Sequence, residues 1–228
     1  MDESTRQQLL INYFSQYVTD RRRETLERVL AQRTRYVTLV LEDIFRAQNS
    51  SAAVRTCECL GLQDIHIIEK QSSYEVNKDV LKGANKWITL IKHKEKNSNN
   101  TERCFAQLKS AGYKILVTDP AIDGIPIDQV SVEKKIALVM GNELEGISDY
   151  ALHHADQKVF IPMAGFTESM NISVSAGICL NTLVPKVRNA HVKWMLTEEE
   201  RQTIRLQWLK KMVRKSDLLE REFLKSIE

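Results

Sequence analysis

The most informative part of this sequence is residues 161–180, IPMAGFTESMNISVSAGICL. An apolar strand, KVFIP, ends here, and a loop leads into a helix without a charged side chain after Glu168. Polar side chains gather at the start of the helix, at Thr167, Glu168, Ser169 and Asn171. Because the first-turn amide groups of a helix can receive an anion or a carbonyl oxygen, we expect a ligand to bind at this junction.

Two other segments have the same arrangement. They are NSSAAVRT at 49–56 and IALVMGNELEGIS at 136–148, and each follows or contains an apolar strand and opens a turn or a helix. In an open parallel sheet the carboxyl ends of the strands form the ligand crevice, so distant loops converge there. The three segments therefore predict one composite site.

Apolar strands and helical segments alternate along the middle of the chain. Strands are expected at 37–41, 65–69, 114–119, 136–140 and 158–162, and helices at 51–60, 102–110, 148–153 and 171–184, the last of them ended by Pro185. Gly61 and Gly112 fall where left-handed helix caps are expected. This alternation predicts an α/β fold with a parallel sheet and helices on both faces.

Both ends of the chain are predicted to be helical extensions. Residues 1–36 form the N-terminal one, 37–185 the central domain and 186–228 the C-terminal one, where Thr197 and Glu200 make a capping box at the start of one long amphipathic helix. The ends are basic and the middle is mildly acidic. This charge pattern fits arms that contact RNA, and it equally fits helix faces exposed to water.

Several protein classes are excluded by composition and motifs. The cysteines lack paired CxxC spacing and no cationic apolar leader is present, which indicates a reduced, cytoplasmic protein. No apolar run approaches the roughly 20 residues that cross a bilayer. The segment MGNELEG is neither a P-loop nor GxGxxG, and no GxSxG elbow occurs. His153 and His154 are adjacent on a helix and point apart, so we expect no metal.

Each candidate site residue has a structural interpretation beside the functional one. Arg55 is either a surface residue or a cation placed for a phosphate or an oxyanion, and Asn49 lies six residues before it. Glu143 accepts from a base or a ribose hydroxyl, or begins a helix cap. Ser169 and Asn171 are ordinary N-cap residue types.

In their order and spacing, the three segments resemble the signature motifs of the SPOUT-class RNA ribose 2′-O-methyltransferases, over about residues 37–185. The resemblance implies a deep trefoil knot in the C-terminal part of the α/β domain. It also implies S-adenosylmethionine as cofactor, held among the loops that contain Thr118, Gly141, Ile161 and Met170. Position 170 is usually leucine in the family, and the unbranched Met170 should still fit against adenine.

The same resemblance implies a homodimer whose active site is completed across the subunit boundary by Arg55, with the small-residue face of helix 171–184 packed against a partner helix. Arg55 is then either a general base or an electrostatic stabiliser of the developing alkoxide, and the second role is physically easier because guanidinium stays protonated. Asn49 would orient the arginine or the cofactor loop. Glu143 would contact the guanosine or support the architecture of its loop, and Ser169 with Asn171 would serve the phosphate and the scaffold of the site.

Within the class, the helical extensions resemble those of the tRNA (guanosine-2′-O)-methyltransferases, which implies methylation of guanosine 18 in the D-loop of tRNA. A sister activity on 23S ribosomal RNA is the nearest alternative, although a separate N-terminal RNA-binding domain of about 70 residues, which those relatives carry, does not fit ahead of Tyr36. An RNA-binding relative that has lost methyl transfer is the third possibility. The intact set of Asn49, Arg55, Glu143, Ser169 and Asn171 argues against it.

Overall fold

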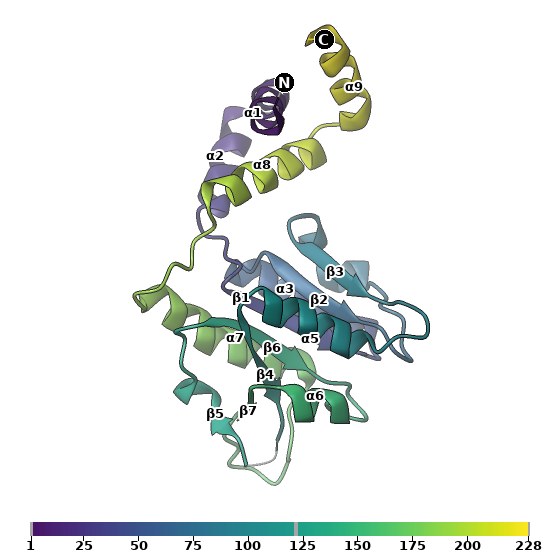
Figure 1. Cartoon of the computed structure of the whole chain (residues 1–228), viewed down its shortest axis with the longest axis vertical. Helices are drawn as coiled ribbons and strands as arrows, with labels where there is room; N and C mark the ends of the chain where they lie inside the picture. Colours follow the sequence, from purple (N-terminus) through teal and green to yellow (C-terminus); the bar gives the residue numbers. More distant parts are fainter. Residues whose placement is uncertain (1, 121–122, 228) are drawn as a thin grey trace. The chain divides into compact units, whose positions relative to one another are not determined.

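The computed structural model of the protein describes residues 2–120 and 123–227. Its centre is a seven-stranded sheet in the order β3-β2-β1-β6-β4-β7-β5 (Figure 1). The strands are β1 Val37–Glu42, β2 Asp64–Ile68, β3 Thr89–His93, β4 Tyr113–Thr118, β5 Ile125–Pro126, β6 Lys135–Met140 and β7 Gln157–Phe160. Every neighbouring pair is parallel. The predicted parallel α/β sheet is confirmed, and the knot stays a prediction.

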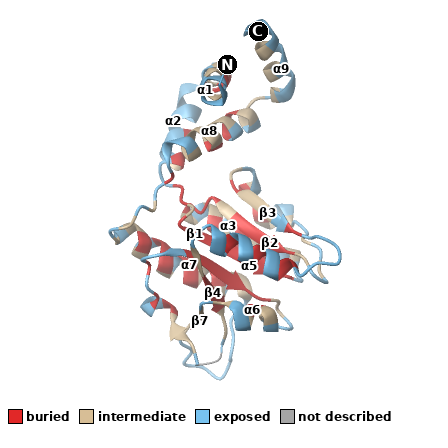
Figure 2. Ribbon diagram, viewed as in Figure 1, coloured by how far each residue is buried: buried red, intermediate tan, exposed pale blue. Residues whose placement is uncertain are grey.

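Helices cover both faces of the sheet (Figure 1). The helices of this part are α3 Ala47–Leu60, α4 Lys78–Leu81, α5 Asn100–Ser110, α6 Asp149–His154 and α7 Ile172–Asn189, with short 3-10 turns at Ala84–Lys86 and Ile127–Gln129. Residues of α3 and α7 pack on one face of the sheet, and those of α5 and α6 pack on the other. Because both faces are covered, the central strands are mostly apolar, and all six residues of β1 are buried, Thr38 and Glu42 included (Figure 2).

Glycine caps end two of these helices as predicted. Gly61 follows α3 with φ 85°, and Gly112 follows α5 with φ 80°. Both values lie in the left-handed region, where a residue with a side chain is strained.

Helix α7 does not end at Pro185 as expected, but continues to Asn189 with the proline inside it. Proline removes one backbone hydrogen bond from a helix interior. Here the buried stripe of α7 includes Leu183 and Val184 before the proline and Val187 after it. We attribute the continuation to this packing, which favours the helix on both sides of the break.

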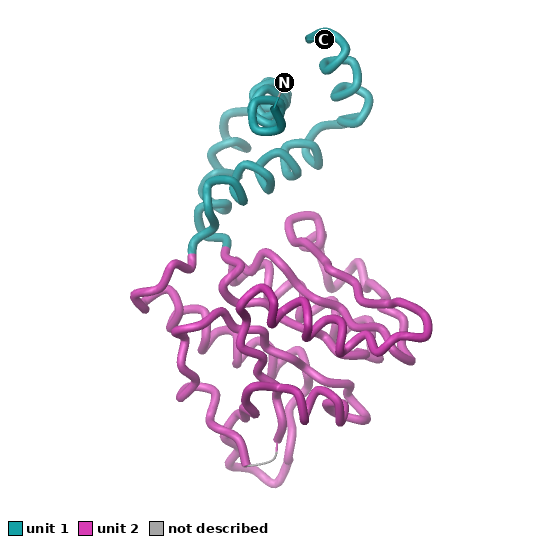
Figure 3. The backbone as a smooth tube through the Cα atoms, viewed as in Figure 1, with its two compact units in different colours: residues 1–33, 195–228 teal, residues 34–194 magenta. Residues whose placement is uncertain are grey.

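The chain divides into two compact units, residues 1–33 with 195–228 and residues 34–194 (Figure 3). The first contains helices from both ends of the sequence, α1 Glu3–Ser15, α2 Asp20–Leu30, α8 Glu198–Met212 and α9 Ser216–Ile227. The expected single C-terminal helix is therefore wrong: it is two helices, and the residue before α9, Lys215, has φ 56°. The Thr197–Glu200 capping box is present.

Within the first unit, α8 packs against α1 and α2. Buried apolar side chains on all three helices form its core, namely Leu10, Ile11, Phe14, Leu26, Leu30, Ile204, Trp208 and Leu209. The two extensions of the sequence therefore depend on each other for burial of their apolar faces. Of the helices in the described residues, none is long and apolar enough to cross a membrane.

Candidate functional site

The candidate site lies where four neighbouring strands end. Strands β1, β6, β4 and β7 are adjacent and parallel, so their carboxyl ends lie along one edge of the sheet. The three sequence segments that were predicted to converge all reach this edge: residues 49–56 follow β1, residues 141–148 follow β6 and residues 161–180 follow β7. Of their loops, residues 162–171 are exposed throughout (Figure 2).

A chain of hydrogen bonds, which we call the polar bridge, joins Asn49, Glu143 and Asn171. The Glu143 carboxylate accepts from Asn49 Nδ2 at 2.7 Å, and Asn49 Oδ1 accepts from Asn171 Nδ2 at 3.1 Å. These residues come from α3, the loop after β6 and the start of α7. The bridge thus brings together one residue from each of the three segments.

Glu143 also fastens the loop after β1, because its carboxylate accepts from the backbone N–H groups of Phe45 and Arg46 at 2.9 and 3.2 Å. Burial opposes ionisation of Glu143, but the hydrogen bonds from Asn49 and from the backbone outweigh it and lower the pKa. Glu143 is therefore a carboxylate and an acceptor. Its partners are the backbone of the loop after β1 and the Asn49 side chain in the first turn of α3, which favours the architectural role among the two that the sequence left open.

Asn171 caps a helix and belongs to the polar bridge at once. Its Oδ1 accepts from Ser173 N at 2.9 Å and from Ser173 Oγ at 2.7 Å, while its Nδ2 donates to Asn49. The cap expected from the sequence is present. Ser169 lies exposed in the loop two residues earlier, and among the described residues it makes no hydrogen bond to the bridge.

Arg55 is on α3 but away from the polar bridge. Asn49 is buried and Arg55 is exposed, and six residues correspond to about 240° around a helix axis, so the two side chains leave α3 on different sides. Arg55 Nη1 donates to Val80 O at 3.3 Å. It borders an open hollow of about 430 Å³ that α7 also lines through Gly177 and Asn181. Within one chain, the structure does not bring the arginine and the bridge together.

The four residues expected to surround the cofactor follow or end three adjacent strands. Thr118 ends β4, and its Oγ1 donates to Val139 O at 3.1 Å. Gly141 follows β6, Ile161 follows β7 and is half-buried, and Met170 is 39% exposed in the loop before α7. They offer backbone groups and apolar surface at one edge of the sheet.

Gly141 has a clear reason to be glycine. A Cβ atom at this position would lie 2.3 Å from the carbonyl oxygen of Gly146, because the loop returns past it. The loop is closed by Asn142 N donating to Gly146 O and Gly146 N donating to Asn142 O, at 2.8 and 2.9 Å. Only a residue without a side chain permits this turn next to the end of β6.

Two adjacent carboxylates that the sequence reading overlooked support the site loops. Asp43 Oδ1 accepts from three successive backbone N–H groups, those of Lys70, Gln71 and Ser72, at 2.8–3.0 Å. The carbonyl oxygen of Asp43 accepts from Asn142 Nδ2 at 2.6 Å. The available signal was the sequence VTLVLED, in which two acidic residues end a mostly apolar strand.

Glu42 is the second of these carboxylates and is 1% exposed. It accepts from Lys70 Nζ at 2.7 Å, from Thr101 Oγ1 at 2.6 Å and from both N and Oγ of Ser148, at 3.0 and 2.7 Å. Burial opposes its ionisation, and these partners together hold its pKa below the ordinary value. Glu42 therefore ties β1 to α5 and to the end of the loop that contains Glu143.

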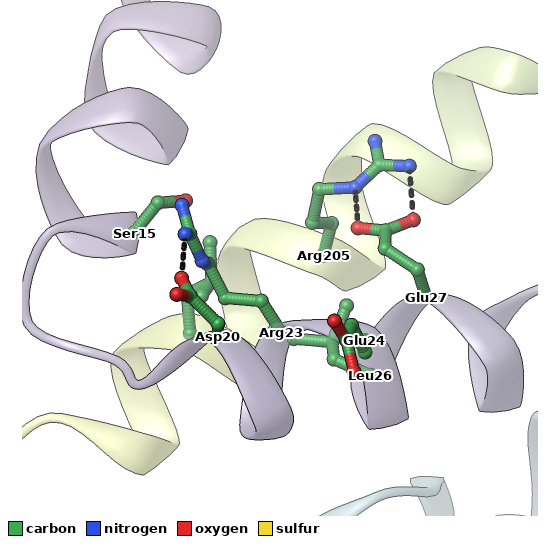
Figure 4. Close-up of a pocket in the computed structure, with 8 residues that line it drawn as sticks. Ser15, Asp20, Arg23, Glu24, Leu26, Glu27 and Arg205 are labelled. Carbon is green, nitrogen blue, oxygen red and sulfur yellow. Dashed lines mark hydrogen bonds and ion pairs between the residues drawn. The ribbon is translucent and has the colours of Figure 1, made fainter.

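The helical unit contains a separate hollow of about 470 Å³ (Figure 4). Arg205 lines it and makes two hydrogen bonds to Glu27, from Nε at 2.6 Å and from Nη2 at 2.8 Å. Arg23 is paired with Asp20 (Figure 4). Both arginines of the hollow are therefore already paired with carboxylates, which weakens the hollow as a binding site for an anion.

Known proteins resemble this chain in sequence and in structure. Residues 36–181 match the SpoU rRNA Methylase family. The tRNA (guanosine(18)-2′-O)-methyltransferase of Borreliella burgdorferi is 39% identical over 210 residues, which are 92% of this chain and 94% of that protein. The protein of the same name from Aquifex aeolicus is 29% identical over 194 residues, 84% of this chain and 90% of that one. The solved A. aeolicus TrmH/SpoU tRNA modifying enzyme matches with a TM-score of 0.75 and 28% identity, over 86% of this chain and 98% of its own.

Proposed function

The chain belongs to the SpoU rRNA Methylase family, and from this membership we propose that it transfers a methyl group from S-adenosylmethionine to the ribose 2′-hydroxyl of guanosine 18 in tRNA. The observation that carries the proposal is the polar bridge, which joins the three loops of the predicted site at the carboxyl edge of the sheet. The tRNA substrate follows from the names of relatives that match over nearly their whole length.

The edge formed by β4, β6 and β7 fits the methyl donor. The absence of a side chain at Gly141 lets the loop backbone close tightly beside the strand end, and backbone amides and carbonyls can then pair with a purine and a ribose. Ile161 and Met170 offer apolar surface for the adenine ring. The cofactor supplies a sulfonium methyl group that a hydroxyl oxygen can accept.

A ribose hydroxyl is a poor nucleophile at neutral pH, so the site must remove its proton or stabilise the oxyanion that develops. Arg55 is our candidate for this role, and the positive charge and N–H donors of a guanidinium group favour electrostatic stabilisation over general-base catalysis. Asn49 and Glu143 hold in place the loop that leads from β1 into α3. Ser169 and Asn171 lie at the start of α7, where the first-turn amides can face a phosphate.

We further propose a homodimer in which Arg55 serves the site of the partner. Its separation from the polar bridge within one chain supports this arrangement. Exposed apolar side chains beside the site, Met163, Phe166 and Val174, supply surface that a second copy would cover. The predicted pairing of α7 with a partner helix cannot use the face that carries Ala176 and Leu180, because that face is buried within the chain. A partner helix would pack against another face of α7.

Mixing two inactive variants tests the shared site. Arg55→Ala and Asn171→Ala chains, refolded together, should regain up to about a quarter of wild-type activity, because mixed dimers keep one intact site. No recovery from chains that have demonstrably mixed would assign Arg55 to its own chain's site.

We also propose that the helical unit contacts RNA and that the enzyme acts in the cytoplasm, where tRNA is modified. Exposed arginines on α2, among them Arg21, Arg22 and Arg28, support the RNA contact.

The decisive experiment supplies labelled S-adenosylmethionine and unmodified tRNA, followed by nuclease digestion and identification of the methylated nucleoside. We expect 2′-O-methylguanosine from position 18, and none from a transcript with adenosine at that position. Label only in 23S ribosomal RNA would reassign the substrate. Binding of tRNA without label in either RNA would indicate a relative that has lost methyl transfer.

A further inference from the structure

Three side chains able to bind a metal gather in the core, away from the candidate site. They are His66 on β2, His93 on β3 and Cys104 on α5, and they are 4%, 6% and 0% exposed. One donor atom from each lies within 4.8 Å of the other two. By contrast, His153 and His154 each place Nδ1 against a backbone carbonyl of their own helix, at 2.7 and 2.8 Å.

The fold accounts for this convergence. Strands β2 and β3 pair in parallel with Ile68 opposite His93, and alternate residues of a strand face the same side, so His66, Ile68 and His93 share one face of the sheet. Helix α5 covers that face and buries Cys104 beside Phe105. Elements that are distant in sequence therefore hold the three donors together.

The spacing of the donors is close to that of a tetrahedral metal site. His66 Nδ1 lies 3.0 Å from His93 Nε2. Zinc bond lengths place two such nitrogens about 3.3 Å apart, and a nitrogen and a thiolate sulfur about 3.6 Å apart. The nitrogens need to separate slightly and the sulfur to approach by about 1 Å at most, within the reach of side-chain torsions.

The chemistry of the cluster also suits a cation. The two imidazole rings lie nearly parallel, 13° apart, and His66 Nδ1 and His93 Nε2 share a hydrogen bond. Such a bond needs a lone pair on one of the two nitrogens, so at least one ring is neutral, and neutral imidazole is the form that binds metals. The Cys104 sulfur adds a soft donor to the two imidazole nitrogens, and Zn²⁺ is commonly bound by such a combination of nitrogen and sulfur ligands.

We propose that His66, His93 and Cys104 form a binding site for a thiophilic divalent cation of the Zn²⁺ class, with a water in the fourth position. On binding, the hydrogen bond between the imidazoles is broken, and the ring that donated it moves its proton to its other nitrogen. The thiol proton of Cys104 passes to solvent, a metal–sulfur bond forms, and the two imidazole nitrogens donate their lone pairs without redox change. The site would fasten α5 to the edge strand β3 and to its neighbour β2. It is independent of the proposed methyl transfer.

A cation has a short route to the cluster. His93 is the last residue of β3, and the six residues that follow it, 94–99, are all exposed. Opening of this loop alone would bring His93 to solvent.

Titration of the chelator-treated, full-length protein with Co²⁺ tests the site. We expect thiolate-to-cobalt charge-transfer absorption that saturates at one equivalent per chain and disappears when Zn²⁺ is added. Cys104→Ser should abolish it and raise the dissociation constant at least about 100-fold, because loss of an outer-shell partner alone costs about 10–100-fold. Cys59→Ser, which removes an exposed thiol on α3, should leave it unchanged.

Loss of the band in Cys59→Ser with retention in Cys104→Ser would overturn the proposal, as would no band in the wild type. Circular dichroism checks that each variant is folded. If Cys104→Ser is not folded, His93→Gln takes its place in the cobalt titration. X-ray absorption of the zinc-loaded wild type needs no variant. We expect a zinc coordination shell with one sulfur atom and two imidazole nitrogens. A coordination shell that contains only nitrogen and oxygen atoms would contradict the site.

Discussion

Single residues in this protein combine helix capping with contacts that join the loops of the candidate site. Asn171 caps α7 with its oxygen and donates to Asn49 with its nitrogen. Both amide groups are occupied, so replacing Asn171 removes a helix cap and one end of the polar bridge together. For such residues, capping and site assembly are compatible interpretations, because different atoms of the same side chain carry out the two roles.

Arg55 is the residue on which we expect catalysis to depend most. Arg55→Ala should lower kcat by about 10²–10³, the usual cost of removing one donor that stabilises an oxyanion. Affinity for S-adenosylmethionine should stay nearly unchanged, because the proposed cofactor contacts are backbone groups and apolar side chains at the ends of β4, β6 and β7 and do not include Arg55. Single-turnover kinetics and calorimetry measure the two quantities.

Arg55→Lys is the matched control for the role of the charge. If the guanidinium stabilises charge, lysine should recover part of the rate at every pH where it is protonated. Full activity in Arg55→Ala would remove the residue from the mechanism.

Gly141→Ala should disrupt the loop after β6. The new Cβ would lie 2.3 Å from a backbone oxygen that a side-chain rotation cannot move. We expect the free energy of unfolding to fall by about 2 kcal/mol, as for other overpacked sites, with loss of affinity for S-adenosylmethionine. Denaturant titration and calorimetry test this.

Gly165→Ala is the comparison for Gly141→Ala. It lies in the exposed loop before α7, and its Cβ would meet its nearest neighbour at 3.9 Å, an ordinary contact. Equal effects of the two substitutions would show that steric closeness at Gly141 is not the cause.

At the scale of elements, Glu42 links β1, α5 and the loop after β6 through side-chain hydrogen bonds. Glu42→Gln removes a buried charge that Lys70 pairs with and should lower the free energy of unfolding by about 3 kcal/mol at pH 7. Urea denaturation measures the difference. Glu133→Gln, at an exposed carboxylate, should change it little.

The effect of Glu42 should depend on pH in one direction. Its pKa in the folded protein is below the ordinary value of 4.5, so its contribution is complete above pH 4.5 and is lost as the pH falls through the folded pKa. Wild type and Glu42→Gln should therefore converge in stability in acid. A constant difference from pH 7 to pH 3 would contradict the assignment.

At the scale of the whole molecule, the helical unit is built from both ends of the chain. Deleting residues 197–228 would remove α8 and uncover the apolar faces of α1 and α2, so truncation cannot separate RNA contact from folding. Changes of surface charge can.

Replacing Arg21, Arg22 and Arg28 of α2 with glutamine should weaken tRNA binding and reduce the slope of log K against log salt by about 2–3, if each contacts a phosphate. All three are exposed. Filter binding across a salt series gives the slope. Replacing the exposed Lys94, Lys96 and Lys134 of the other unit changes the net charge equally and should leave the slope unaltered.

The sequence by itself determined the parallel sheet, the helix caps at Gly61 and Thr197 and the convergence of three loops, because local pattern and strand direction fix these features. Only the tertiary structure decided that α7 passes Pro185, that Arg55 lies apart from the polar bridge, and that His66, His93 and Cys104 meet. Each of these features depends on packing between segments that are distant in the sequence. The polar bridge shows the same dependence, because the hydrogen bonds that link Asn49 to Glu143 and to Asn171 span 94 and 122 residues. Periodicity within a segment carries no information about which faces meet.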